Sequence, residues 1–290
     1  MPRFVILFFV IFVTFSTSFG FAEDAREIMR NLIDRDDGTT ELTRIRLSTC
    51  RYKKEGKRVV CVETPRTKIL EGVRKDWGPR GKDHKTITMV LDPPGERGIG
   101  FLQYDYEKWG KETDQWIYLS AMGKVKRIIS GNENEPKTGS FFGSEISYED
   151  MEAHHLEDYT YTILASETYQ KRPCWVIESI PIPEHARRSN YSKIVDWVDK
   201  ERFLVLKSIL YNRQGKKVKR VTARKPELIN GIWFVRYVLI SNLITRRMTV
   251  MIFEAVALNI PIEDEFLTQR TLTDGAFRES TLKRLRLYLK

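Results

Sequence analysis

The fold depends on one stretch, Phe141-Phe142-Gly143-Ser144-Glu145-Ile146-Ser147-Tyr148-Glu149-Asp150-Met151, which puts two aromatic side chains directly before a helix start. Ser147 with Asp150 three residues later is a close relative of the capping box, in which a hydroxyl accepts from a backbone N–H and an acid lies at the positive helix end. The pattern predicts a helix over residues 147–156. Phe141 and Phe142 follow a polar, glycine-rich loop over residues 131–139, so we expect them to pack against an apolar surface elsewhere.

Outside this stretch the hydrophobic pattern mostly has a period of two, which is typical of strands with one wet face. Short turns separate nearly all of these segments, and this predicts an up-and-down antiparallel meander, because a parallel crossover needs a dozen or more residues. Roughly twelve strands in one strongly twisted sheet are expected to curl. The predicted strands are a hairpin of 45–49 with 59–63, then 84–92, 99–106, 115–120, 124–130, 159–166, 174–180, 192–198, 203–211, 218–224, 232–243 and 248–256.

Two further segments have the helical period. Residues 24–35 carry an apolar stripe, formed by Ala25, Ile28, Met29, Leu32 and Ile33, which predicts a first helix. Residues 274–290 place leucines at spacings of three and four among basic residues, which predicts a basic amphipathic helix. This basic C-terminal tail, residues 271–290, is either a surface helix docked on the sheet or a segment that touches a membrane transiently.

Several ordered short motifs point to one family. They are Trp116-Ile117-Tyr118-Leu119, Val125-Lys126-Arg127-Ile128, Phe142-Gly143-Ser144, Ser147-Tyr148-Glu149-Asp150, Pro173-Cys174-Trp175-Val176-Ile177-Glu178-Ser179, Trp197-Val198-Asp199-Lys200 and Asn230-Gly231-Ile232-Trp233. In this order the chain resembles the outer-membrane lipoprotein-sorting protein family, the LolA-like periplasmic carriers, over residues 25–270. The resemblance implies an α+β fold with an antiparallel half-open β-barrel, helices covering its concave apolar face, and one lipid- or lipoprotein-binding domain over residues 23–270.

The N-terminal segment predicts export. Residues 4–15 form an apolar run after Arg3, and Gly20 and Ala22 are small residues at the positions that a signal peptidase recognises. An uncleaved membrane anchor is the competing interpretation, but the run is shorter than the roughly 20 residues of a spanning helix. We therefore predict a signal peptide over residues 1–22 and a soluble periplasmic protein, not itself lipidated because no cysteine follows the cleavage site.

The chain is basic, with 49 Lys and Arg against 39 Asp and Glu, a formal net charge of +10. Such a surplus is also found in nucleic-acid-binding proteins. Here the basic residues are spread through strand-like segments, and export removes the chain from DNA and RNA. Attraction to anionic lipid head groups or to an acidic partner fits better.

No catalytic or metal-binding pattern is visible. His154 and His155 are adjacent on the predicted helix and point in different directions, whereas ligands on one helical face need a spacing of three or four. His84 and His185 lack identifiable partners. We therefore expect no enzyme, no cofactor and no metal.

The spacing of the cysteines suggests a disulfide between Cys50 and Cys61. If Lys54 pairs near Lys57 across the first hairpin turn, Cys50 falls opposite Cys61. An exported protein can keep such a bond, and closing a loop of about a dozen residues would stabilise by roughly 3 kcal/mol. A bridge and two free thiols remain the alternatives, while Cys174 is expected to be a buried free thiol.

The strands carry bulky residues on both parities, which fits either a packed core or a partly open groove. The resemblance favours the groove, where each methylene of an acyl chain contributes about 0.8 kcal/mol. The chain would then be a carrier of lipid or lipoprotein acyl chains, served by an inner-membrane transporter. The alternative is a non-lipid-binding structural adaptor of such a transporter. The expected cavity wall is Ile28, Met29, Leu32, Leu47, Met89, Tyr118, Phe141, Phe142, Met151, Trp233 and Tyr237.

Overall fold

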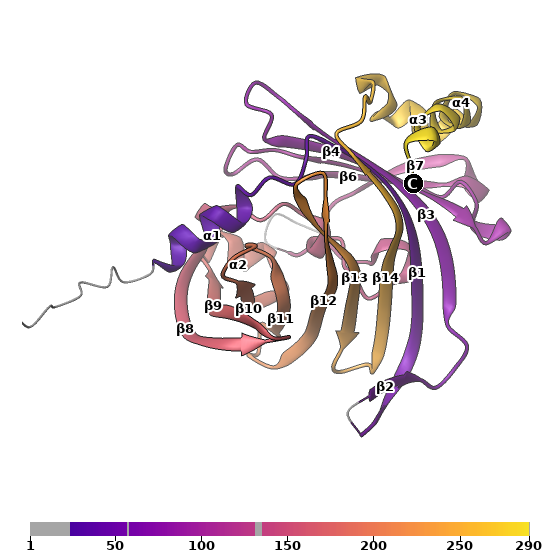
Figure 1. Cartoon of the computed structure of the whole chain (residues 1–290). Coiled ribbons are helices and arrows are strands. Elements are labelled where there is room, and N and C mark those ends of the chain that lie inside the picture. The colour runs from indigo at the N-terminus through magenta and orange to yellow at the C-terminus, as the bar shows by residue number, and fades with distance from the viewer. Residues whose placement is uncertain (1–23, 57, 131–134, 290) are drawn as a thin grey trace, which may run out of the picture.

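The computed structural model describes residues 24–56, 58–130 and 135–289, so the predicted signal peptide over residues 1–22 lies outside the described residues. One antiparallel sheet of 14 strands dominates the molecule and does not close, because β7 and β8 form its two edges (Figure 1). The prediction of an open, curved antiparallel sheet is confirmed. The strands are β1 (Thr40–Glu55), β2 (Arg58–Cys61), β3 (Arg66–Trp77), β4 (Asp83–Asp92), β5 (Gly100–Asp105), β6 (Asp114–Leu119), β7 (Lys124–Ile128), β8 (Tyr159–Tyr169), β9 (Arg172–Pro181), β10 (Tyr191–Asp199), β11 (Val205–Asn212), β12 (Lys217–Ile229), β13 (Ile232–Asn242) and β14 (Arg247–Leu258).

Strand β1 lies in the middle of the sheet, between the meander β3 to β7 and the meander β8 to β14. Within each meander, strands adjacent in sequence pair as predicted. Strand β3 was not predicted, and the hairpin assigned to residues 59–63 is only the short β2; Glu71 and Gly72 interrupt the apolar alternation of β3. The ladder between β1 and β14 joins opposite ends of the chain, which no local pattern indicates.

In the described part of the chain, four α-helices accompany the sheet: α1 (Ala25–Ile33), α2 (Pro183–Arg188), α3 (Gln269–Thr273) and α4 (Gly275–Leu285). Helix α1 lies within its predicted range. Among the described residues no helix is both long and apolar enough to cross a bilayer.

The helix predicted over residues 147–156 is wrong. Two short 3₁₀ turns, Glu149–Met151 and Leu156–Asp158, flank extended backbone there. The reciprocal capping bonds do form, since Ser147 N donates to Asp150 Oδ2 over 2.7 Å and Asp150 N donates to Ser147 Oγ over 3.3 Å. The Glu149 side chain also accepts from Ser189 and Asn190, just before β10, and the Asp150 side chain pairs with Lys219 of β12. These tertiary contacts replace the helix.

The convex face of the β3 to β7 half is covered by the C-terminal helices (Figure 1). Leu42, Val73 and Leu102 of the sheet form one cluster with Leu272 and Leu282 of α3 and α4. Just after α4, Arg286 Nη2 donates to the fully buried Glu71 carboxylate over 2.7 Å. The segment predicted as a basic tail is therefore docked on the sheet along α3 and α4.

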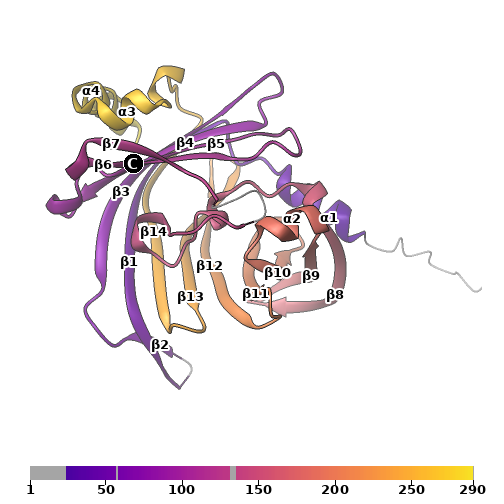
Figure 2. The ribbon, with the colours of Figure 1, turned by 180° about the vertical axis from the view of Figure 1, so that it is seen from behind.

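The concave face is crossed by residues 137–158, which we call the strap (Figure 2). Its apolar side chains form a second cluster with Leu47, Leu70 and Phe101 of the sheet. Helix α1 packs on Trp175, Ile177 and Val198. The row of paired residues Ile177, Asp196, Ser208, Val221, Ile240 and Thr249 runs from this contact to the centre of the sheet. Helix α1 and the strap therefore lie on the same face.

Candidate functional site

The strap fills the centre of the concave face with its own aromatic side chains. Phe141 and Phe142 are 2% and 7% exposed. Phe101 from β5 meets Phe141 edge-on with ring centroids 5.3 Å apart and stacks on Tyr148 at 5.9 Å. The predicted apolar destination of the Phe141-Phe142 pair is thus the sheet, and the concave face is occupied by the chain itself.

Glu145 anchors the strap to the last two strands. Its carboxylate accepts from Arg247 Nε over 2.7 Å and from Asn242 Nδ2 over 3.0 Å. Its backbone N–H donates to Thr249 Oγ1 over 2.9 Å. These contacts include an ion pair between a carboxylate and a guanidinium in a partly buried site. Charge-assisted hydrogen bonds of this kind are stronger than neutral ones.

Asp150 anchors the strap to the middle of the β8 to β14 meander. Its carboxylate forms an ion pair with Lys219 of β12 and accepts from the Tyr191 hydroxyl over 2.7 Å. The Lys219 side chain is only 9% exposed. Burial and the neighbouring Asp150 raise the pKa of Tyr191, so its hydroxyl remains a donor. Next to Asp150, Glu149 accepts from the backbone and side chain of Asn190.

A buried amide network holds the strap to the β3 to β7 meander. Gln115 Nε2 donates to Tyr148 O over 3.0 Å, and Gln103 Nε2 donates to Met151 O over 2.5 Å. Asp105 accepts from Ala153 N over 3.2 Å. These buried side chains form hydrogen bonds with strap backbone groups that have no neighbouring strand to pair with.

The backbone of the strap is strained at its apolar end. Phe142 has φ of 49°, in the left-handed region that a bulky side chain avoids. Such a conformation costs about 1 to 3 kcal/mol and persists only when surrounding packing enforces it. Here that packing is the contact of Phe142 with the sheet. The strained backbone conformation of Phe142 therefore depends on the strap being bound to the concave face.

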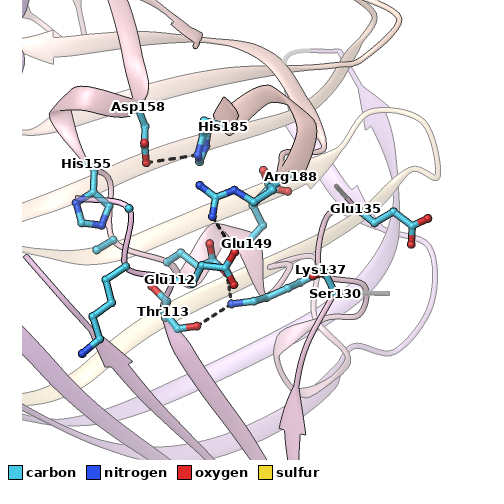
Figure 3. A pocket seen from close by; sticks show the side chains of 14 residues that line it. Glu112, Thr113, Ser130, Glu135, Lys137, Glu149, His155, Asp158, His185 and Arg188 are labelled. Carbon is cyan, nitrogen blue, oxygen red and sulfur yellow. Dashed lines mark hydrogen bonds and ion pairs between the residues drawn. The ribbon is translucent and has the colours of Figure 1, made fainter. Parts of the chain in front are cut away.

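The C-terminal end of the strap holds buried titratable groups. His154 stacks on Tyr159 with ring centroids 4.3 Å apart, and its Nε2 lies 2.9 Å from the Tyr161 hydroxyl. Burial, with His185 as a second cause, lowers the pKa of His154 to about 4. His185, for which the sequence indicated no partner, has its Nδ1 3.4 Å from Asp158 Oδ2 (Figure 3).

Two cavities near the strap have evenly mixed polar and apolar linings, and a third, beside the C-terminal helices, has a mainly apolar lining. One of about 60 Å³ is surrounded by charged groups including Lys137, Glu149 and Arg188 (Figure 3). One of about 610 Å³ lies between the end of α1, the loop after β5 and the strap residues 153–157. A third of about 430 Å³ lies beside α4. None of the eleven expected wall residues lines any of the three.

The expected wall residues divide between the two faces. Leu47 lies on the concave face with the strap residues Phe141, Phe142 and Met151, and Ile28, Met29 and Leu32 of α1 pack at its β8 to β10 end.

The expectation that the other four face the same surface is corrected by the structure. Met89 and Tyr118 belong to the convex cluster under α3 and α4. Trp233 packs with Cys174 and Leu204, and Tyr237 follows the opposite parity to the concave Val238. Alternation alone cannot say which face is which, and an error of one residue inverts a strand.

Cys50 and Cys61 are joined by a disulfide with Cα atoms 5.8 Å apart, and Cys174 is a buried free thiol. The register that suggested the pair is wrong, because Cys61 lies opposite Tyr52. Cys50 is two residues from Tyr52 and therefore a diagonal neighbour on the same face, still within reach.

Lys219, Asn242 and Arg247, which hold the strap, carry no signal in the sequence that marks them as site residues. Their strands were predicted, but a single basic residue in a strand usually faces water, so only their pairing with acidic strap residues singles them out. Within the described part of the chain, no group of three His, Cys, Asp or Glu side chains could hold a metal ion.

Comparison with known proteins places this geometry in a family. A family model described as "Uncharacterized protein" matches residues 82–274, and no curated protein matches the chain. A DUF1329 family protein from Desulfovibrio piger is 22% identical with a TM-score of 0.75, over 86% of this chain and 97% of that one. A putative outer membrane lipoprotein-sorting protein domain from Vibrio parahaemolyticus is 24% identical, with a TM-score of 0.73 over 86% and 98%. The LolA superfamily protein NE2245 from Nitrosomonas europaea is 18% identical, with a TM-score of 0.61 over 85% and 98%. These likenesses establish the LolA-type fold.

Proposed function

We propose that this chain, which belongs to the family of uncharacterized proteins matched over residues 82–274, is a non-enzymatic periplasmic carrier. It would hold a lipid or lipoprotein acyl chain against the concave face of its sheet. The similarity to the putative outer membrane lipoprotein-sorting protein domain from Vibrio parahaemolyticus supports this class of guest. An inner-membrane transporter that hands over the guest is part of the same proposal.

The observation that carries the proposal is how the strap is attached. It puts Phe141, Phe142 and Ile146 into the apolar concave face, yet its β-bridge is internal, from Ser140 to Ser147. Its bonds to the strands come mostly from side chains. The strap can therefore lift without breaking a ladder of the sheet.

A guest would take the place of the strap's apolar side chains. Lifting the strap uncovers Leu47, Leu70 and Phe101, and an acyl chain laid there recovers about 0.8 kcal/mol for each buried methylene. Relief of the φ strain at Phe142 contributes in the same direction. Ile28, Met29 and Leu32 of α1 would cover the far end of the guest as a second lid.

A tethered strap tests the carrier proposal. In a Cys174→Ala background, Asp150→Cys and Lys219→Cys place one thiol on the strap and one on β12, and a short bifunctional maleimide joins them. Uptake of the neutral apolar dye N-phenyl-1-naphthylamine is followed by fluorescence. We expect the tethered protein to lose most of the uptake.

The control is the same double variant with each thiol capped by a monofunctional maleimide, which should still take up the dye. Native mass spectrometry of the purified wild-type protein should also find a co-purifying lipid. Full uptake by the tethered protein would show that the strap is no lid. A wild-type protein that carries no lipid and takes up no dye would contradict the carrier and favour the alternative, a structural adaptor that binds no lipid.

A further inference from the structure

Three polar side chains form a row across adjacent strands of the concave face. Lys219 of β12 pairs with Asn242 of β13. Between β13 and β14 the last pair in the register is Ser241 with Met248, and Asn242 and Arg247 are the next residue on each strand. Both Asn242 and Arg247 reach the same carboxylate, that of Glu145. We call Lys219, Asn242 and Arg247 the polar row.

The polar row borders the apolar surface directly. Two residues further along each strand, on the same face, lie Val221, Ile240 and Thr249, which are paired with one another. Beyond them come Val238 and Met251, which pair with each other, and Met251 pairs in turn with Leu47. A molecule laid along these strands would meet cationic donors at one end and hydrocarbon along the rest.

The strap occupies this surface as an amphiphile would. Its carboxylates sit on the polar row, with Asp150 on Lys219 and Glu145 on Arg247. Its apolar side chains Phe141, Phe142 and Ile146 lie on the hydrocarbon part. Anionic and apolar groups of the chain thus already fill both halves of one site.

We propose that the polar row is a headgroup subsite for an acyl chain with an anionic head, a carboxylate or a phosphate, and that the strap is its internal stand-in. This inference rests on the proposed carrier function and adds the guest's chemical class. When the strap lifts, Lys219 and Arg247 lose their carboxylate partners next to an apolar surface. A buried cation without a partner is costly, so the open form favours a guest that brings its own anion over one that does not.

The test compares two guests that differ only in the head. Dodecanoate and 1-dodecanol displace N-phenyl-1-naphthylamine from the full-length mature protein at pH 7.5. We expect wild type to prefer dodecanoate by about tenfold or more, as a charge-assisted hydrogen bond predicts. The double variant Lys219→Gln and Arg247→Gln should lose the preference while its affinity for the alcohol is kept or improved, because the strap is also released.

Two further variants separate the headgroup subsite from general effects. Arg220→Gln removes an exposed charge one residue from Lys219, on the other face of β12, and should leave the preference unchanged. Glu145→Gln removes the competing carboxylate, so it should raise the preference for dodecanoate and remains informative if the double variant does not fold.

The outcomes of this test are distinct. Equal affinity of wild type for acid and alcohol would overturn the headgroup subsite and leave the carrier intact. Absence of binding of dye, acid and alcohol would overturn the carrier and the subsite together. Displacement by 50 mM sodium acetate or inorganic phosphate as effective as that by dodecanoate would show a free-anion site and overturn the acyl guest.

Discussion

At the scale of single residues, the concave face holds a carboxyl group in an environment that opposes its charge. Asp196 of β10 is 7% exposed, and its Oδ1 accepts from Ser208 Oγ over 2.5 Å. Burial raises the pKa of Asp196 to about 6, with only the Ser208 hydrogen bond acting against it. An ionised Asp196 therefore destabilises the folded protein, since the unfolded chain ionises this group near its ordinary pKa.

The sign of the pH dependence follows from this difference. Between about pH 4 and pH 6 the folded state binds more protons at Asp196 than the unfolded state, so this residue lowers the free energy of unfolding as the pH rises through that window. We predict that Asp196→Asn increases the free energy of unfolding at pH 7.5 by on the order of 2 to 3 kcal/mol and changes it little at pH 4. Urea unfolding at the two pH values measures this. An equal change at both would contradict the linkage.

The ion pair between Arg286 and Glu71 joins the C-terminal segment to the sheet. Glu71 is fully buried, and Arg286 Nε and Nη2 both donate to it. Removing one partner of a buried pair leaves an uncompensated charge, so we predict that Arg286→Gln costs about 3 kcal/mol of unfolding free energy. The matched control is Arg284→Gln, whose exposed pair with Glu263 should contribute less than about 1 kcal/mol. Similar losses in the two variants by urea unfolding would contradict the assignment.

At the scale of elements, the hairpin of β1 and β2 depends on its cross-link. Strand β2 has four residues, and among the strands that the structure describes it pairs with β1 alone, so few backbone hydrogen bonds hold it. Purified protein denatured without reductant should take up one alkyl label, at Cys174, and three after reduction. Labelling of Cys50 or Cys61 before reduction, seen by mass spectrometry of peptides, would contradict the bridge.

The energetic effect of the cross-link is a separate prediction. Replacing Cys50 and Cys61 together by alanine should lower the free energy of unfolding by about 3 kcal/mol, from the loop-closure entropy of the unfolded chain. Cys174→Ala serves as the control that keeps the bridge. No difference in urea midpoint between the double variant and this control would contradict a stabilising bridge.

At the scale of the whole molecule, the sheet has two buried faces with different covers. Helices α3 and α4 cover the convex side of the β3 to β7 half, and the strap and α1 lie on the concave side (Figures 1 and 2). A chain that ends at Arg270 would expose Leu102 and leave Glu71 without Arg286. We predict that this truncation prevents stable folding, judged by circular dichroism and thermal unfolding. The control Leu287→Ser changes an 84% exposed side chain and should shift stability by less than about 0.5 kcal/mol.

Local pattern was enough to predict much of this architecture. The apolar stripe of residues 24–35 predicted α1, the period of two with short turns predicted both meanders, and the motif order predicted the LolA-type fold. The first two features depend on interactions between residues close in sequence, where side-chain periodicity and turn chemistry act directly. The LolA-type fold was implied by the resemblance of the ordered motifs to a known family.

The facing of individual strands, the central ladder and the polar row depend on contacts between distant parts of the chain. Periodicity predicts that neighbouring side chains point to opposite faces of the sheet, but not which face is concave. Met89 and Tyr118 were therefore assigned to the concave face, whereas they lie under α3 and α4 on the convex face. The place of β1 beside β14 and the failure of residues 147–156 to form a helix arise from contacts with residues far away in the chain. The polar row has the same origin, because Lys219 and Arg247 become a site only where three strands and the strap meet.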